Sequence, residues 1–259
     1  MPCSCSSNAD YGLNAVHGVQ SRCGSKNDSE GNIIANCPTS FPSPNALGCA
    51  FNETLWRAMT DVIGHEMRSL WLQGIGENHG NGLPHIGLNT WSPNINVCRD
   101  PRWGRCQEVP GESSYVNGRY GVQYSHGLQI GSDDRYYRGV TCLKHWAAYS
   151  LESYGSHTRH NFVANVSDYM LQTVYLPAFK AGITEGNAQS VMCSYNAIAL
   201  QVGDNSTEFG PGVPTCASKT LAHILREEWG FTGEPTAIQR PNAPFSALEP
   251  KPPVPDPCP

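Results

Sequence analysis

Four short polar clusters carry the side chains of this sequence whose types and spacing could support chemistry. They are Asn14-Ala-Val-His17-Gly18, the segment from Cys98 to Cys106, the pair Lys144-His145, and the segment from Met192 to Asn196. The last three each follow an apolar run directly. Guanidinium, ammonium, imidazole, amide and phenol groups form the hydrogen bonds that a polyol requires. Taken singly, however, each cluster also fits an ordinary structural role, such as a turn or an ion pair.

The segment from Cys98 to Cys106 gathers three arginines around one aspartate and one tryptophan. This composition also describes a purely structural ion-pair cluster. A disulfide between Cys98 and Cys106 would stiffen the loop and help to hold Arg105 in place. In the fourth cluster, Tyr195 either supplies a hydroxyl and an aromatic wall or is an ordinary half-buried tyrosine.

Cysteines and glycosylation sequons indicate the compartment. The chain contains eleven cysteines, and acceptor sequons begin at Asn27, Asn52, Asn165 and Asn205. This combination is typical of an oxidising, secretory environment, so we expect an extracellular protein. The N-terminus, beginning at Met1, has no basic region followed by an apolar core, and no signal peptide is visible. An extracellular composition without an export signal indicates a fragment or an incomplete gene model.

The remaining cysteines give weaker expectations. A second disulfide is expected between Cys23 and Cys37. Cys142 and Cys193 lie inside apolar runs, where a buried thiol is the better expectation. No close cysteine pair has the spacing of a zinc knuckle, so we expect no metal site and no cofactor.

Charge and hydropathy argue against two classes of partner. Charged residues make up only 15% of the chain, the formal net charge is −5, and there is no Lys/Arg run. A nucleic-acid partner is therefore not expected. No stretch approaches the roughly 18 apolar residues that a membrane-spanning helix needs. No segment is basic and amphipathic enough for a membrane surface.

Hydrophobic periodicity supplies the elements that must position these clusters. Helical spacing of apolar residues begins at Asn52, near Glu112, at Ser167 and near Ser218, with the last helix ending at Gly230. Between the helices lie three short apolar runs that are typical of buried strands, at 87–97, 139–148 and 189–198.

The alternation of helix and strand predicts an α/β fold with a parallel sheet, which is either a barrel or a doubly wound sheet. No glycine-rich nucleotide loop follows any strand, so we favour a partial (β/α)8 TIM-like barrel. In such a barrel the working residues lie at the carboxyl ends of the strands, where three of the clusters fall. We place the barrel at residues 1–233. The segment 234–259 is rich in proline and is expected to be a disordered or extended tail.

Taken as an ordered set, the clusters resemble the N-terminal barrel of family-3 glycoside hydrolases, most closely the β-xylosidase-like branch. The matching segments run from about residue 10 to residue 233 and are His17-Gly18, Thr39-Ser-Phe-Pro42, Ala50-Phe-Asn52, Asp100-Pro-Arg-Trp-Gly-Arg105, Gly111-Glu112, Lys144-His145, Thr158-Arg-His-Asn161, Met192-Cys-Ser-Tyr-Asn196, Val213-Pro-Thr-Cys216 and Leu225-Arg-Glu-Glu-Trp-Gly-Phe-Thr-Gly233.

The resemblance implies which residues grip the sugar. The positions that hold the non-reducing sugar in family members correspond to Arg105, Lys144, His145 and Tyr195. An acidic residue normally stands three positions before the His-Gly motif, where this chain has Asn14. An amide still donates and accepts hydrogen bonds but lacks the strength that charge adds. Glu112 is expected to be a supporting or structural carboxylate rather than a catalytic one.

The resemblance also implies a catalytic residue that this sequence does not contain. A retaining glycosidase needs a nucleophile and an acid/base, and in this family the nucleophile is an aspartate on the strand after Trp-Gly-Phe-x-Gly. Here Gly233 is followed by Glu234-Pro-Thr-Ala-Ile-Gln239, without an apolar run or an aspartate. Pro235 would also remove a ladder hydrogen bond from a central strand. The family's acid/base belongs to a later domain, so we assign no catalytic residue.

Substitutes for the missing carboxylate are weak. Asp100 is flanked by arginines, which would keep it ionised but occupied. Glu152 is the only other carboxylate that merits attention. One branch of the family uses an Asp-His pair after the Lys-His strand. His157 and His160 lie in that region, but no aspartate accompanies them.

The sequence therefore predicts a partial barrel of a retaining exo-β-glycosidase that hydrolyses β-xylosides or β-glucosides of plant-type polysaccharides. By family it is a glycoside hydrolase with a carbohydrate partner, and the chain alone is expected to be inactive. Two alternatives stay open. One is a non-catalytic carbohydrate-binding or decoy protein, and the other is a truncated gene model without an independent function.

Overall fold

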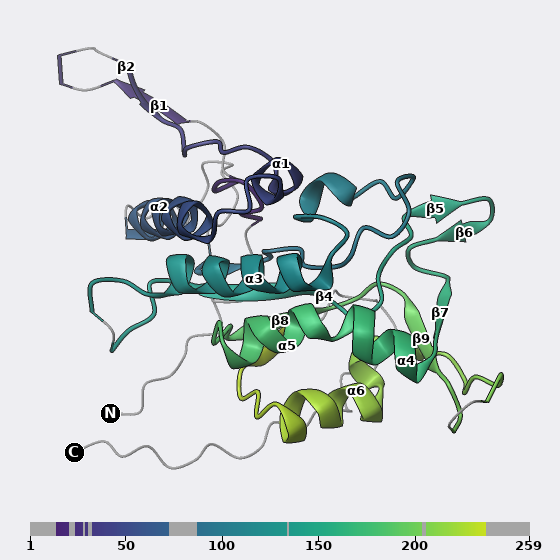
Figure 1. The fold of residues 1–259 in the computed structure, drawn as a ribbon. Coiled ribbons are helices and arrows are strands. Elements are labelled where there is room, and N and C mark those ends of the chain that lie inside the picture. The colour runs from purple at the N-terminus through teal and green to yellow at the C-terminus, as the bar shows by residue number, and fades with distance from the viewer. Residues whose placement is uncertain are drawn as a thin grey trace.

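The computed structural model of the chain describes residues 14–20, 24–27, 29–30, 33–72, 87–133, 135–203 and 206–236. These residues form an α/β arrangement in which helices pack against a parallel sheet (Figure 1). None of the described helices is long and apolar enough to cross a membrane.

The central sheet has four strands in the order β11-β8-β4-β3, and all three pairings are parallel. The strands are β3 (Asn89–Thr90), β4 (Val140–Trp146), β8 (Ser190–Cys193) and β11 (Glu234–Thr236). Leu143 pairs with Val191, and both side chains are fully buried. β4 and β8 are buried along nearly their whole length, so neither shows the alternating pattern of a strand with one exposed face. The predicted α/β class with a parallel sheet is confirmed.

Three helices begin where the sequence predicted, at Asn52, Ser167 and Ser218, and each has a capping side chain there. In α2 (Glu53–Leu72) the side-chain oxygen of Asn52 accepts a hydrogen bond from the backbone N–H of Leu55 at 3.0 Å. The hydroxyl of Ser167 accepts from the backbone of α4 (Asp168–Met170), which continues into η3 (Leu171–Tyr175). Ser218 caps α6 (Lys219–His223), which continues as η5 (Ile224–Glu228). Gly230, at φ +66°, ends this helix in a conformation that favours glycine.

Three helices, α2, α3 (Ser114–Gln129) and α5 (Pro177–Thr184), pack side by side (Figure 1). The helix α3 packs against α2 on one side and against α5 on the other. Gly127 allows α2 and α3 to approach closely, because a Cβ there would lie 2.0 Å from the hydroxyl of Thr60 and 2.5 Å from the carbonyl oxygen of Arg57. The apolar stripe on α2 packs against α3 in a cluster that includes Trp56, Ile63, Met67, Tyr120, Tyr124 and Leu128.

A second buried cluster joins the sheet to α5 and α6. It includes Leu143, Val191, Trp146, Phe179, Leu221 and Leu225. Burial of each large apolar side chain contributes about 1.5–3 kcal/mol. This cluster fixes the position of β4 and β8 relative to α5 and α6. The residues that follow the two strands are positioned by the same packing.

The smaller elements lie around this framework. They are β1 (Gly24–Asn27), β2 (Ile33–Asn36), α1 (Pro44–Gly48), η2 (Cys106–Glu108), β5 (Ser153–Tyr154), β6 (His157–Thr158), β7 (Val163–Val166), β9 (Ala197–Leu200), β10 (Val213–Pro214) and η4 (Thr215–Ala217). β1 pairs with β2, β5 with β6, and β9 lies between β10 and β7.

Two strand predictions need correction. The run 87–97 forms only the short strand β3 and one bridge from Asn94 to Lys144. Pro93 has no N–H to donate, so the ladder cannot continue through it. The expectation that Pro235 disfavours a strand is also wrong, because Pro235 lies in β11 at the edge of the sheet, where a missing donor is tolerated. The rest of the predicted tail, from 237 to 259, lies outside the described residues.

Candidate functional site

The carboxyl ends of β4 and β8 place three of the predicted site residues together. Lys144 and His145 lie near the end of β4, and Tyr195 follows β8. Lys144 and His145 are buried. This is the edge of a parallel α/β sheet where ligands bind.

Asn14 reaches this edge from the N-terminal segment. The backbone N–H of Ala15 donates to the hydroxyl of Ser92 at 2.9 Å, and the buried hydroxyl of Tyr124 donates to the carbonyl oxygen of Ala15 at 2.5 Å. These two bonds join the segment to the loop after β3 and to α3. They place the side chain of Asn14 beside Lys144, although the two residues are 130 positions apart in the sequence.

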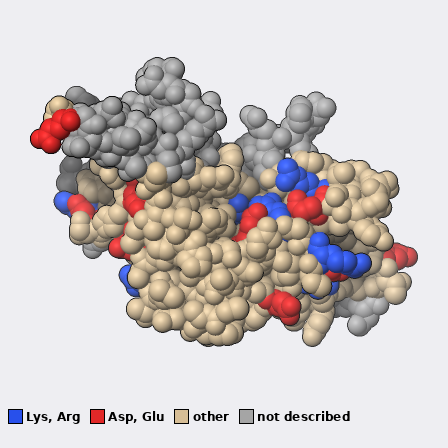
Figure 2. Space-filling model, turned by 90° about the horizontal axis from the view of Figure 1, so that it is seen from above, with Lys and Arg blue, Asp and Glu red and all other residues tan. Residues whose placement is uncertain are grey.

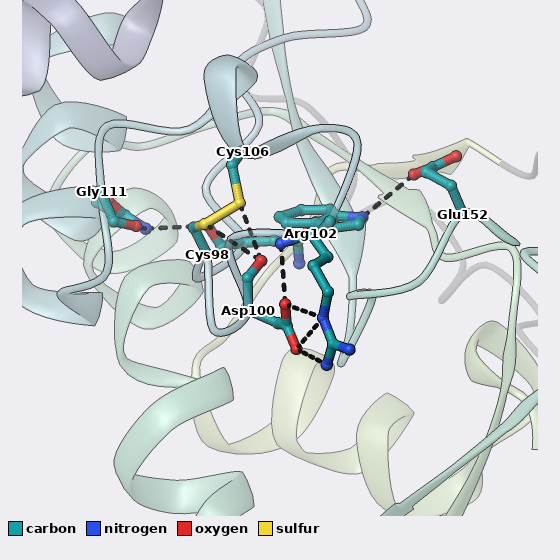
Figure 3. Close-up of a disulfide and its surroundings, with 9 residues drawn as sticks. Cys98, Asp100, Arg102, Cys106, Gly111 and Glu152 are labelled. Atoms are coloured by element: carbon teal, nitrogen blue, oxygen red, sulfur yellow. Dashed lines mark hydrogen bonds and ion pairs between the residues drawn. A yellow bond between two sulfur atoms is a disulfide. The ribbon is translucent and has the colours of Figure 1, made fainter. Parts of the chain in front are cut away.

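The loop after β3 is closed by a disulfide between Cys98 and Cys106, as expected (Figure 3). Inside it, Arg102 donates to both carboxylate oxygens of Asp100, at 2.9 and 2.6 Å. The side-chain and backbone hydrogen bonds from Arg102 lower the pKa of Asp100 to about 2. Asp100 is therefore ionised and occupied by Arg102, and its role is to shape the loop that carries Arg105.

Arg105 leaves this loop toward the interior and pairs with Glu108, three residues later on the short turn η2. Arg105 Nε and Nη2 lie 2.9 and 2.6 Å from the two carboxylate oxygens of Glu108. Burial alone would raise the pKa of Glu108, but the hydrogen bonds and charge of Arg105, with the charge of Lys144, hold that pKa below its ordinary value. The pair is thus a bidentate ion pair at the wall of the site.

Lys144 is the second cation of this wall. Its ammonium nitrogen lies 3.2 Å from Asn14 Oδ1 and 4.0 Å from Glu108 Oε2. Burial lowers the pKa of Lys144 to about 8, since the neighbouring Glu108 offsets only part of the cost of desolvation. Two ammonium protons have no acceptor among the described residues, so they are available to oxygen atoms of a ligand.

His145 is held by protein on both ring nitrogens. Nδ1 lies 3.2 Å from Asn96 Oδ1, and Nε2 lies 3.1 Å from a guanidinium nitrogen of Arg105. Because Arg105 can only donate, Nε2 accepts, and the proton is on Nδ1. Burial, together with the cations of Arg105, Lys144 and Arg159, holds the pKa of His145 well below its ordinary value. The imidazole is therefore neutral and orients Arg105.

Tyr195 belongs to an aromatic cluster beside this wall. Its ring centroid lies 5.4 Å from that of Tyr149, 5.5 Å from that of His145 and 5.2 Å from that of His160. The guanidinium of Arg159 lies over the Tyr195 ring at 4.4 Å. Such a cluster offers an aromatic surface next to the buried cations.

A cavity of about 650 Å³ adjoins these groups. Its lining includes Asn14, His17, Thr39, Arg105, Glu108 and Lys144. The structure thus brings the first three clusters to one cavity. Three of the five residues predicted to bind substrate, Asn14, Arg105 and Lys144, line the cavity. The other two do not line it: His145 contacts Arg105, and Tyr195 packs against His145.

Glu108 is the functional residue that the sequence analysis missed. Glu112, which was expected to be a supporting or structural carboxylate, is exposed and has no ion pair among the described residues. The available signal was the spacing of three residues between Arg105 and Glu108, which places oppositely charged side chains on the same face of a helical turn. The short turn η2 provides that geometry.

Glu152 is occupied as well. Its carboxylate accepts from the hydroxyl of Tyr149 at 2.5 Å and from the indole N–H of Trp103 at 3.2 Å (Figure 3). It also lies 3.6 Å from Arg159 and 4.0 Å from Arg105. These four donor or cationic groups therefore compete with any reacting atom for this carboxylate.

The cysteine predictions are partly wrong. Cys193 forms a disulfide with Cys216 rather than remaining a buried thiol. The reason is tertiary: β9 and β10 form an antiparallel pair that returns the chain to the end of β8. Cys142 is buried and is in no disulfide. Cys37 is disulfide-bonded, but its predicted partner Cys23 lies outside the described residues.

The glycosylation candidates differ in position. Asn52 and Asn165 are exposed, at the start of α2 and on β7. Asn27 lies on β1. Asn205 falls outside the described residues.

Comparisons with known proteins match this sequence and fold to carbohydrate-cleaving enzymes. The solved structure of a family-3 exo-beta-xylosidase, XlnD, in complex with a xylobiose aziridine probe, superimposes with a TM-score of 0.70 at 30% identity, covering 88% of this chain and 26% of that one. Beta-glucosidase 3B from Thermotoga neapolitana, in complex with glucose, shares the fold with a TM-score of 0.63 at 21% identity, over 87% of this chain and 26% of that one.

Curated relatives extend the match in sequence. Exo-1,4-beta-xylosidase bxlB from Emericella nidulans is 38% identical over 220 residues, which is 85% of this chain and 26% of that protein. Beta-D-xylosidase 1 from Arabidopsis thaliana is 35% identical over 196 residues, 75% of this chain and 22% of that protein. The chain thus spans about a quarter of the length of these relatives.

Together these matches define the class: a domain of the glycoside hydrolases, which include xylosidases and glucosidases. The family model described as the glycosyl hydrolase family 3 N terminal domain matches residues 25–234. The chain belongs to this family.

Proposed function

We propose that this chain is the sugar-holding part of a retaining exo-β-glycosidase that acts on β-xylosides or β-glucosides. The observation that carries the proposal is the cavity of about 650 Å³ lined by Arg105, Lys144, Asn14 and Glu108. Two buried cations with unused donors, held by one carboxylate, match the row of hydroxyls on a pyranose ring. The relatives named above as xylosidases and glucosidases support the same substrate class.

We further propose that the 259-residue chain binds sugar without cleaving it. Retaining hydrolysis needs two carboxyl groups about 5–5.5 Å apart, one of them free to attack the anomeric carbon. Glu108 and Glu152 are the carboxylates beside the described site, and both are engaged by arginine. The segment after Gly233 contains no aspartate before residue 256. The same arrangement also supports the second candidate function, a carbohydrate-binding protein that takes no part in catalysis.

In this proposal, the parallel sheet β3-β4-β8-β11 is the first part of a (β/α)8 barrel. Because β11 (Glu234–Thr236) pairs with β8, the proposed boundary between barrel and tail moves from residue 233 to the end of β11. The two disulfides support an extracellular location. The sequons at Asn27, Asn52, Asn165 and Asn205 are proposed as glycosylation sites.

Calorimetry on the 259-residue chain with methyl β-D-xyloside and methyl β-D-glucoside tests the binding proposal. Arg105→Ala and Lys144→Met should abolish the heat of binding. Arg102→Ala is the matched control, because Arg102 lies on the same loop but pairs with Asp100 on the exposed side. Binding that persists in both cavity variants would contradict the proposal.

Aryl β-xylosides and aryl β-glucosides test the lack of catalysis. We expect no release of the aryl group by the purified chain. Turnover that disappears in Glu152→Gln would overturn this part and identify Glu152 as a substitute carboxylate.

A further inference from the structure

The charges at the cavity wall do not balance. Among the described lining residues, the charged side chains are Arg105, Lys144 and Glu108, which leaves one positive charge in excess. Behind Arg105, the charges of Arg159 and Glu152 offset each other at 3.6 Å. The wall is therefore cationic where its side chains are least accessible to water.

Asn14 is the reason for this excess. Its amide oxygen is the hydrogen-bond acceptor closest to the Lys144 ammonium, at 3.2 Å, and it is uncharged. Glu108, at 4.0 Å from Lys144, is already bound to two nitrogens of Arg105. A single carboxylate is thus shared between two cations, and Lys144 keeps two protons without an acceptor in the described part of the chain.

A further carboxylate, that of Glu66, approaches from α2. It accepts hydrogen bonds from the backbone N–H and hydroxyl of Thr39, which lines the cavity. Thr39 is exposed and Glu66 is only partly buried. Solvent screens this charge far more than it screens Lys144 and Arg105. Figure 2 shows Lys and Arg side chains beside Asp and Glu side chains on the face seen from above.

We propose that this cavity prefers a sugar that itself carries a carboxylate, a hexuronic acid or its glycoside, over the neutral sugar of the same ring configuration. The ligand carboxylate completes the pair that Asn14 leaves open, by accepting hydrogen bonds from the Lys144 ammonium and adding a negative charge beside Arg105. The ring hydroxyls use the remaining donors and acceptors of the wall. This inference rests on the proposed function, namely that the cavity binds sugars.

Charge explains the direction of the preference. Hydrogen bonds between ionised partners are roughly twice as strong as those between neutral groups. The CH2OH group of a neutral hexoside can accept from Lys144 but cannot cancel its charge. A buried cation without a counterion is costly, and an anionic ligand removes that cost on binding.

The experiment compares two ligands that differ only at C6, methyl β-D-glucuronide and methyl β-D-glucoside, by calorimetry at about pH 6.5, below the pKa of Lys144. We expect the glucuronide to bind about tenfold more tightly, or better, at low ionic strength. Added salt should weaken binding of the glucuronide and leave the glucoside almost unchanged, because only the first complex pairs opposite charges.

Asn14→Asp is the decisive variant. It keeps the shape of the side chain and supplies the absent charge next to Lys144, so it should reverse the preference in favour of the glucoside. Gln172→Glu is the control, since it adds the same negative charge at an exposed position on η3, outside the cavity lining. It should leave the ratio of the two affinities as it is.

The outcomes separate the two proposals. Equal binding, or tighter binding of the glucoside by the unmodified chain, overturns the preference and leaves the sugar-binding proposal intact. Binding of neither ligand, nor of the xyloside, overturns the proposed function itself. A glucuronide preference that survives in Asn14→Asp also overturns this inference, because it would place the carboxylate elsewhere.

Discussion

The two carboxylate oxygens of Glu108 lie 2.9 and 2.6 Å from two nitrogens of the Arg105 guanidinium. This planar, two-point contact fixes the direction of the guanidinium as well as its distance, which a single contact cannot do. His145 holds the third nitrogen of Arg105 at 3.1 Å. Arg105 is therefore oriented before any ligand arrives, which lowers the entropic cost of binding.

Glu108→Gln should disrupt this arrangement without changing the shape of the side chain. The amide keeps one acceptor but loses the charge, so Arg105 and Lys144 remain buried without a counterion. We expect the free energy of unfolding to fall by about 3 kcal/mol and sugar binding to weaken. Urea unfolding and calorimetry measure the two effects. Glu112→Gln is the matched control and should change stability by less than about 0.5 kcal/mol. Equal effects of both variants would contradict the role given to Glu108.

Lys144 should make stability depend on pH in the alkaline range. Its pKa is about 8 in the folded chain against an ordinary 10.5, and burial is the main cause. Between these values the unfolded chain keeps a proton that the folded chain has lost. The free energy of unfolding should therefore rise as pH increases from about 8 to 10.5, by on the order of 3 kcal/mol in total.

Lys144→Met tests this dependence. The variant should lose the alkaline rise and be more stable than the unmodified chain at neutral pH, because the desolvation cost is removed. Thermal unfolding at several pH values measures both effects. Lys219→Met, at an exposed position at the start of α6, should retain the rise. A rise of the same size in Lys144→Met would assign it to another group.

The disulfide between Cys98 and Cys106 should matter for binding as well as for stability. The two residues are separated by 8 positions, and closing so short a loop stabilises the fold by about 2.5 kcal/mol in the chain-entropy model. Because Arg105 is adjacent to Cys106, the double variant Cys98→Ser/Cys106→Ser should also weaken sugar binding. Cys49→Ser, which changes an exposed cysteine that is in no disulfide, serves as the control. Unchanged affinity in the double variant would show that the Glu108 contact alone holds Arg105.

Asn52 should have two separable roles. Its side-chain oxygen caps α2 through the N–H of Leu55, while its amide nitrogen is the proposed point of glycan attachment. Asn52→Asp keeps a good cap and removes the sequon, so it should lose the glycan and little stability. Asn52→Ala should lose the glycan and about 1 kcal/mol besides. Mass spectrometry of secreted protein and urea unfolding distinguish the roles. An equal loss of stability in both variants would mean that the glycan, not the cap, stabilises the helix.

The sequence predicted most of the framework because the framework depends on local patterns. The helix starts at Asn52, Ser167 and Ser218 and the end of the last helix at Gly230 are short-range features, and each is confirmed. The run 139–148 was recognised as a strand because it is buried on both faces and therefore mostly apolar. The first strand was overestimated because Pro93 interrupts a run that otherwise has the same composition.

The position of the polar clusters at one end of the sheet was also determined by the sequence, since parallel strands joined by helices must end on the same side. Only the tertiary structure decided which charged and polar side chains contact one another there. The distance of 3.2 Å between Asn14 and Lys144 spans 130 residues. The pairing of Glu108 with Arg105 depends on one short turn. The bond from Cys193 to Cys216 depends on a hairpin that returns the chain. Such pairings follow from packing of distant segments and leave no periodic signal in the sequence.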